Sequence, residues 1–493
     1  MSQAPLHYRP AHQLADDLRS GKLTSVELTQ SLLHRINSHN PHINAFTYVD
    51  GKSALEAAAD ADARLKAGVE PGPLHGLPLT VKDTWEVAGM PCTAGAPKLK
   101  RHRPKQSAAV VQRLQDAGAI ILGKSNVPLY ASDIQSYNRL FGVTNNPHNK
   151  NHTPGGSSGG AAAALAAGMT PLEIGSDLAG SIRTPSHFCG VFGHKPSRGL
   201  ISMRGHIPGP PGALSEPDLV TGGPMARTSD DLELLLDVLA GPNSQEARSW
   251  KLEMEQSSHA SLSQVRVGHW FSDPACPIDK ELAAGYQNLT DQIARSGVSI
   301  SPARHPLLDL ERILPVYFCL LGGLMGGSLK PAQKRQMLVA SHLDPILSRV
   351  TSMTVGSGHY GRGVNLSYGE WLMWNEKREQ MRAQVETLFN EYDVLLTPVT
   401  PTTAIPHDHS QPVFRRKIQV SGKPRPYMDQ FCWIALATLL GLPATSVPIG
   451  RTANGLPYNV QVIGAPGKDL TTIGFARLLE QQGLAGFQVP AGF

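Results

Sequence analysis

Two clusters of glycine and serine, separated by a run of alanines, constrain this chain more than any other feature of its sequence. The first cluster spans residues 154–160 (PGGSSGG) and the second spans residues 175–183 (GSDLAGSIR). Glycine beside serine lets the backbone adopt unusual φ and ψ angles and approach a bound group closely. Backbone N–H groups in tight turns and at helix starts form oxyanion sites. The pattern therefore predicts a reaction centre built on a serine hydroxyl.

The surrounding sequence alternates strand-like and helical segments. Residues 79–81 and 119–124 are short apolar runs typical of buried strands, and residues 107–118 between them have the spacing of an amphipathic helix. This β-α-β order predicts an α/β architecture. Further strands are expected at residues 190–196, 265–270, 392–399, 441–450 and 458–464, the last two as a hairpin.

The other segments have helical patterns. Thr24 and Glu27 form a capping box that opens a helix expected to end at Asn40-Pro41. Helices are also expected at residues 11–18, 53–67, 232–240, 280–296 and 470–481. We expect one domain over residues 1–493, made of N-terminal helices (1–68), a catalytic core (70–242), a variable helical covering region (264–390) and C-terminal core strands with a helix (391–485).

Composition excludes several classes of protein. The chain has 45 basic and 40 acidic residues, and its net charge of +5 does not favour a nucleic-acid partner. Its five cysteines are odd in number and include no C-x-x-C, which disfavours a disulfide framework and a metal site and favours buried thiols. The N-terminus lacks the pattern of a signal peptide, and no run reaches the roughly 18 apolar residues of a membrane span. We therefore expect a cytoplasmic protein.

Two familiar motifs fit the first cluster poorly. A phosphate-binding loop needs a terminal Gly-Lys-Ser/Thr or a G-x-G-x-x-G that opens a helix, and neither is present. Residues 155–159 match the G-x-S-x-G of an α/β-hydrolase nucleophile elbow. That elbow needs a strand directly before the serine, and residues 149–154 (NKNHTP) cannot form a central strand.

The chain resembles the amidase signature family from about residue 10 to residue 485. The resemblance is carried by residues 76–83, 141–147, 154–190, 222–228, 393–398 and 441–464. It implies an α/β/α sandwich with a central twisted mixed β-sheet covered by helices. It also implies a Ser–cis-Ser–Lys triad of Lys82, Ser157 and Ser181, in which the two serines have the family's spacing (181 − 157 = 24). Ser158 is the neighbouring alternative for the middle role.

The chemistry of these side chains agrees with that implication. A serine hydroxyl is a weak nucleophile and needs a base, so Ser181 would depend on a proton acceptor. A lysine can serve when burial lowers its pKa, and Lys82 lies among apolar strand residues. Taken alone, however, Lys82 reads as a lysine at a strand end whose amine reaches water. Ser157 would relay the proton, and the oxyanion hole would consist of backbone N–H groups from Leu178, Ala179, Gly180 and Ser181.

Other residues near the second cluster have less direct roles. Asp177 and Arg183 are interpreted as a local pair that supports the loop. A histidine base stays open as an alternative, with candidates at His187, His194 and His206. Cys189 is expected in the core.

Two positions depart from the family's usual pattern. Ala179-Gly180 stands where the family usually has Gly-Gly, and a Cβ at position 179 restricts φ and ψ and could narrow the oxyanion hole. Asn459 stands where a glycine is common. Substrate contacts are expected from Ala131 and Ser158.

The predicted function is hydrolysis of a small-molecule amide to an acid and an amine, without cofactor or metal, by a monomer or homodimer. The resemblance to the family implies a pocket built by residues 127–137 and 264–390, where Trp371 and Trp374 hint at apolar or aromatic amides. Aryl, fatty, aliphatic and carbamate substrates, and esters, stay open. The alternatives are the glutamine-hydrolysing component of a tRNA-dependent amidotransferase, a carbamate or ester hydrolase of the same family, and a catalytically silent binding protein.

Overall fold

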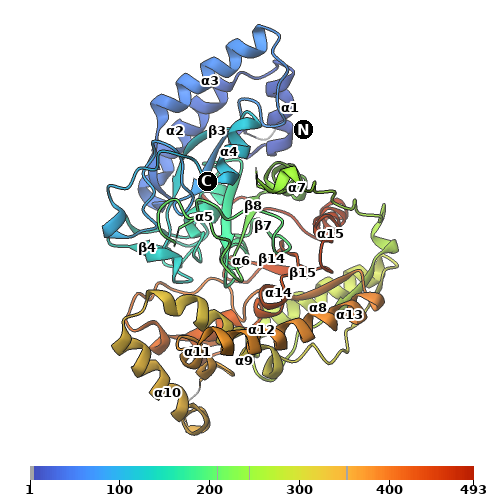
Figure 1. Ribbon diagram of the computed structural model, residues 1–493. Coiled ribbons are helices and arrows are strands. Elements are labelled where there is room, and N and C mark those ends of the chain that lie inside the picture. Colours follow the sequence, from blue (N-terminus) through green and yellow to red (C-terminus); the bar gives the residue numbers. More distant parts are fainter. Residues whose placement is uncertain (1–4, 208, 244, 351–352) are drawn as a thin grey trace.

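A large mixed β-sheet forms the centre of the molecule, and helices cover it (Figure 1). The computed structural model describes residues 5–207, 209–243, 245–350 and 353–493. Within them the sheet has eleven strands, which are β1 (Phe46–Val49), β2 (Pro78–Lys82), β3 (Ile120–Ser125), β6 (Glu173–Asp177), β7 (Phe192–Lys195), β8 (Thr221–Ala226), β9 (Arg266–His269), β10 (Ser299–Pro302), β11 (Val394–Pro398), β14 (Ala444–Arg451) and β15 (Pro457–Ile463). Their spatial order is β1-β3-β2-β6-β8-β7-β14-β15-β11-β9-β10. The predicted α/β class is confirmed.

Strand pairing brings the two glycine and serine clusters to one region of the sheet. β2 lies parallel to β3 on one side and to β6 on the other. β2 ends at Lys82 and β6 ends at Asp177. Because carboxyl ends of parallel strands meet at the same edge of a sheet, these two residues lie close together.

The structure contains strands that the sequence did not indicate. β1, β6, β8 and β10 were not predicted. Poor strand formers (glycine, proline, serine and aspartate) are frequent in β6, β8 and β10, and β1 is only four residues long. Neighbouring strands determine the conformation of β6 and β8, which pair with each other in antiparallel register. Two short hairpins lie outside the main sheet, one formed by β4 (Tyr137–Asn138) and β5 (Gly142–Val143), the other by β12 (Lys417–Val420) and β13 (Lys423–Pro426).

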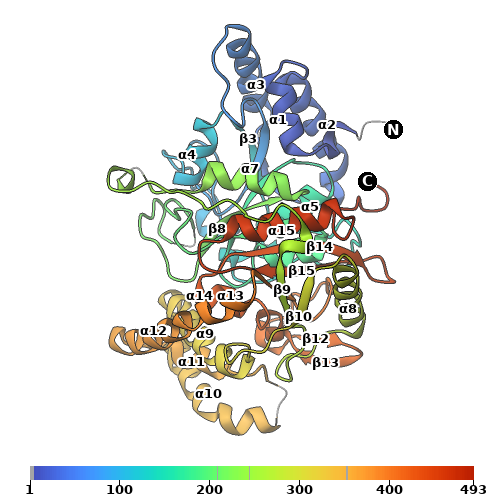
Figure 2. The ribbon, with the colours of Figure 1, turned by 90° about the vertical axis from the view of Figure 1, so that its right-hand side faces the viewer.

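Helices pack on both faces of the sheet, and Figure 2 shows α7 and α15 together in front of it. α5 contacts β2, β3, β6 and β8, and all eight of its residues are buried, which suits its small alanine side chains. The helices of the first half are α1 (Ala11–Arg19), α2 (Ser25–Ile43), α3 (Gly51–Lys66), α4 (Ala109–Asp116), α5 (Gly159–Ala166), α6 (Arg183–Cys189) and α7 (Ser229–Leu239). The expected end of the second helix is corrected: α2 contains Pro41 and ends at Ile43, where Asn44 takes a left-handed conformation.

The region expected as a helical cover also contributes to the sheet. β9 and β10 are its strands, and its helices gather mostly at the lower end of the molecule in Figure 1. Trp371 and Trp374 are partly buried against a hydrophobic cluster that includes Tyr317 and Trp433. The remaining helices are α8 (Lys280–Arg295), α9 (Leu310–Met325), α10 (Pro331–Val350), α11 (Gly358–Gly363), α12 (Tyr368–Ala383), α13 (Val385–Glu391), α14 (Ala435–Leu440) and α15 (Asp469–Gln481). Across the described ranges, no helix is both long and apolar enough to cross a membrane.

Candidate active site

Lys82 is a fully buried amine at the end of β2. Its Nζ donates to Ser157 Oγ at 2.7 Å, to Ser176 Oγ at 3.0 Å and to the Ser176 carbonyl at 3.3 Å. Burial lowers the pKa of Lys82 to about 7, against the opposing effect of the Asp177 and Glu173 carboxylates. The amine is therefore largely neutral above this pH and can accept a proton.

Ser157 and Ser158 connect the two clusters. The Gly156-Ser157 peptide bond is cis, and Ser157 is 1% exposed. The Ser158 N–H donates to the Ser181 carbonyl at 3.1 Å, and Ser158 Oγ donates to the Ser176 carbonyl at 3.4 Å. The structure thus brings Lys82, Ser157 and Ser181 into one site, with Ser158 as a link between the loops that carry the two serines.

Ser181 lies in a tight turn between β6 and α6 and is 8% exposed. Gly180 has a φ of +86°, which favours glycine, and a Cβ there would lie 2.7 Å from Thr184 Oγ1. Ala179 does not have a positive φ, so its Cβ does not impose left-handed backbone strain. The glycine needed by this turn is at position 180, and the alanine at 179 causes no backbone strain.

The Asp177 carboxylate holds this turn from within. Its Oδ1 accepts the Gly180 N–H at 2.9 Å, and its Oδ2 accepts the Ile182 N–H at 3.1 Å, so the residues on both sides of Ser181 are fixed. Burial acts to raise the pKa of Asp177, but the Arg183 guanidinium and its hydrogen bonds hold the pKa at about 2. Asp177 is therefore ionised at neutral pH.

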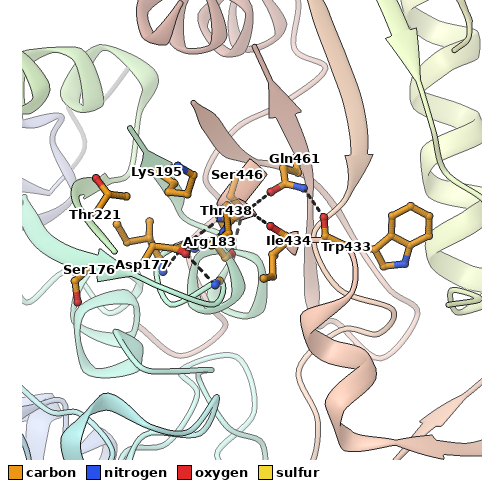
Figure 3. Close-up of polar contacts among 12 residues, drawn as sticks. Ser176, Asp177, Arg183, Lys195, Thr221, Trp433, Ile434, Thr438, Ser446 and Gln461 are labelled. Atoms are coloured by element: carbon orange, nitrogen blue, oxygen red, sulfur yellow. Dashed lines mark hydrogen bonds and ion pairs between the residues drawn. The ribbon is translucent and has the colours of Figure 1, made fainter. Parts of the chain in front are cut away.

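Arg183 forms the expected pair with Asp177 and extends it across the molecule (Figure 3). Its Nε and Nη2 donate to the two carboxylate oxygens at 3.0 and 2.9 Å. Its other donors reach Thr438 Oγ1 at 2.7 Å, the Ile434 carbonyl at 3.0 Å and Gln461 Oε1 at 2.7 Å. All of these side chains are buried, so the turn is fixed to the C-terminal part of the sheet.

The backbone N–H groups expected in the oxyanion hole differ in their surroundings. The Gly180 N–H donates to Asp177. The N–H groups of Leu178, Ala179 and Ser181 have no acceptor among the described residues. Three of the four expected donors are therefore without an acceptor in the described part of the chain, whereas the N–H of Gly180 is already bonded.

Histidines and cysteines near the site have other surroundings. Both ring nitrogens of His187 lie within hydrogen-bond distance of backbone atoms, and those of His194 are close to Asp469 and Thr445. His206 packs edge-on against Trp85, and burial together with the nearby lysines lowers its pKa well below its usual range. All five cysteines are buried and free, and Cys189 lies in the core as expected.

The loop expected to contact substrate lies beside the first cluster. A Cβ on Gly156 would lie 2.7 Å from the Asp133 carbonyl oxygen and from the Ile134 carbonyl carbon, so this part of the loop packs directly against the cis peptide. Asp133 is paired with Arg416 at 2.7 Å. Ala131 belongs to the same loop, is partly buried and has a φ of +54°.

Sequence reasoning missed several buried polar residues of the site, namely Ser176, Lys195, Thr438 and Gln461. The available signal was a polar side chain within an apolar strand, as Gln461 stands between Val460 and Val462. Asn459, whose role was open, donates to the Val191 carbonyl at 2.9 Å and to Ser446 Oγ at 3.0 Å. It therefore fixes neighbouring strands.

Comparison with known proteins places the chain in a family. A family model described as Amidase matches residues 27–473. The chain is 34% identical over 467 residues to a glutamyl-tRNA(Gln) amidotransferase subunit of Symbiobacterium thermophilum, a match that covers 91% of this chain and 92% of the relative. A solved structure described as an amidase is 27% identical with a TM-score of 0.74, and the match covers 96% of this chain and all of that one. A bacterial aryl acylamidase of the amidase signature family, 23% identical, has the same fold with a TM-score of 0.79, and the match covers 99% of this chain and 100% of the other. The chain therefore belongs to the amidase family, the amidase signature enzymes that its motifs resemble.

Proposed function

We propose that the chain hydrolyses a carboxylic amide through a serine acyl-enzyme, with Ser181 as nucleophile, Ser157 as proton relay and Lys82 as base. The observation that carries the proposal is the 2.7 Å hydrogen bond from Lys82 Nζ to Ser157 Oγ in a fully buried setting. Burial gives the lysine a pKa of about 7, which suits a base at neutral pH.

The reaction would proceed in two stages. Ser181 Oγ attacks the amide carbonyl carbon while its proton passes to Ser157 Oγ, whose own proton passes to neutral Lys82. The same path returns a proton to the amide nitrogen, the C–N bond breaks and the amine leaves. Water then attacks the acyl-enzyme ester, and the acid is released with Ser181 restored.

The developing oxyanion would bind to backbone N–H groups of the nucleophile turn. Leu178, Ala179 and Ser181 offer N–H groups without another acceptor among the described residues, and Gly180 holds the turn by its bond to Asp177. Loss of one such donor typically costs about 2.7–4 kcal/mol of transition-state stabilisation.

A second candidate function is supported by the names of the relatives. Several matching proteins are glutamyl-tRNA(Gln) amidotransferase subunits. In that case glutamine would be the amide, and the chain would work within an assembly instead of as the predicted monomer or homodimer. Glutamine hydrolysis that appears only when partner proteins are added would support this candidate. Turnover of simple amides by the purified chain alone would favour the first.

The direct test is turnover of a panel of anilides, aliphatic amides, carbamates, esters and glutamine by the purified chain. We expect amide hydrolysis that is lost in Ser181→Ala. A Ser181→Ala variant that still hydrolyses the preferred amide at the original rate would contradict the proposal. The panel also identifies the substrate class, including the apolar or aromatic amides that Trp371 and Trp374 suggest.

A further inference from the structure

Gln461 is a buried amide whose hydrogen-bonding groups are satisfied at both ends. It lies on β15, where every residue is buried, and is 0% exposed. Its Oε1 accepts from Arg183 Nη1 at 2.7 Å. Its Nε2 donates to Thr397 Oγ1 at 2.7 Å, with the Trp433 and Pro398 carbonyls at 3.2 and 3.3 Å. The amide therefore acts as acceptor on one side and donor on the other.

Arg183 is saturated by its partners, and Gln461 is one of them. The guanidinium makes two bonds to Asp177 and single bonds to Thr438, Ile434 and Gln461. In Figure 3, Gln461 lies between Arg183 and the Trp433 carbonyl, while the Trp433 indole points away from them. Because a guanidinium has five N–H donors in one plane, each fixed acceptor limits its rotation and position.

The position of Arg183 reaches Ser181 through Asp177. The carboxylate that pairs with Arg183 also accepts the N–H groups on either side of Ser181, at Gly180 and Ile182. A shift of the guanidinium would move this carboxylate and, with it, the turn that carries the nucleophile. A displacement of about 1 Å at a reacting group can cost 10²-fold in rate.

The same amide also helps to fix the segment beside the turn, at Trp433 and Ile434. Gln461 Nε2 is bonded to the Trp433 carbonyl, and Arg183 Nη1 is bonded to the next carbonyl, that of Ile434. The Ile434 side chain lies 3.2 Å from the position that a Cβ on Gly180 would occupy. Gln461 therefore couples the nucleophile turn to the apolar segment packed against it.

We infer that Gln461 is a positioning residue of the active site, which holds Arg183, and through it the Ser181 turn, in the geometry needed for acylation. The inference rests on the proposed function. It requires the amide itself and not only its volume, since one end must accept from Arg183 while the other donates to Thr397 and the Trp433 carbonyl.

The experiment compares rates of Ser181 labelling by a serine-directed fluorophosphonate in the wild type, Gln461→Met and Gln461→Glu. Gln430→Met is the matched control, because Gln430 is also fully buried but donates to Thr402 and makes no bond to Arg183. We expect labelling about 10- to 100-fold slower in Gln461→Met, as for loss of a buried hydrogen-bonding partner, and within a few-fold of wild type in Gln430→Met.

Gln461→Glu gives a readout that a loss of packing would not give. The charged side chains that face this position are Arg183 and, behind it, Asp177 and Lys195. The introduced carboxylate keeps nearly the same volume and can accept from Arg183, which holds it ionised as it does Asp177, but it cannot donate to Thr397 or to the Trp433 carbonyl. Gln461→Glu should therefore label faster than Gln461→Met and more slowly than wild type, by a similar factor at each pH from 6 to 8.

The outcomes separate the two proposals. A wild-type chain that is not labelled at all contradicts the proposed function and the inference built on it. If the wild type is labelled and Gln461→Met is labelled within twofold of the wild-type rate, the inference about Gln461 is wrong while the proposed function stands. If Gln461→Met does not fold, Gln461→Glu decides: labelling more than twofold slower than wild type supports the inference, and labelling within twofold of wild type overturns it.

Discussion

At Lys82, burial and hydrogen bonding act on the same amine. Burial lowers its pKa to about 7, and Ser157 Oγ lies 2.7 Å from its Nζ. Only the neutral amine can take a proton, so a step limited by acylation should accelerate as the pH rises through about 7 and level off above it. A rate that is flat from about pH 5 to 9 would contradict Lys82 as the base.

Substitution separates Lys82 from the histidine alternative. Lys82→Met removes the proton acceptor and should reduce the acylation rate by about 10²- to 10⁴-fold. His206→Asn is the comparison, because His206 is buried near Lys82 and its ring packs on Trp85. We expect this variant to keep the wild-type pH profile, measured by initial rates on one amide. Loss of the alkaline rise in His206→Asn, with its retention in Lys82→Met, would assign the base to the histidine.

At the scale of single elements, the nucleophile turn depends on a left-handed residue. Gly180→Ala places a Cβ at a φ of +86°, 2.7 Å from Thr184 Oγ1. The backbone strain should cost about 1–3 kcal/mol of folding stability. The displaced turn should also slow labelling of Ser181 by about 10²-fold.

Gly199→Ala is the control for this change. Gly199 has a φ of +85°, and a Cβ there would meet no atom within 4 Å. Gly199→Ala should lower the thermal midpoint by a similar amount and leave the rate of Ser181 labelling at the wild-type value. Equal labelling rates in the two variants would mean that the conformation at position 180 does not set the geometry of Ser181.

The elements also show which local patterns are reliable in this sequence. The capping box of Thr24 and Glu27 is present, because both of its hydrogen bonds are local to one turn. The β14–β15 hairpin was predicted from two apolar, β-branched runs, and it forms in antiparallel register. β6 was not predicted because it ends in Ser176 and Asp177, which are poor strand formers. Ser176 binds Lys82 and Asp177 holds the nucleophile turn, so these polar residues belong to the site.

At the scale of the whole molecule, the sheet joins residues that the sequence separates widely. The α/β class and the positions of Lys82, Ser157 and Ser181 followed from strand patterns and from family motifs. The bond between Gln461 and Arg183 could not be predicted, since it spans 278 positions and depends on the strand order. The bond from the Gly180 N–H to Asp177 could not be predicted either, because a glycine-rich motif does not reveal which backbone donors are already bonded.

The most direct measurement is peptide mapping by mass spectrometry after treatment of the purified chain with a serine-directed fluorophosphonate. We expect one adduct per chain, located on Ser181, absent in Ser181→Ala and formed much more slowly in Lys82→Met. An adduct on another residue, or a folded wild-type chain that acquires none, would contradict the assignment of Ser181 as the nucleophile of this amidase.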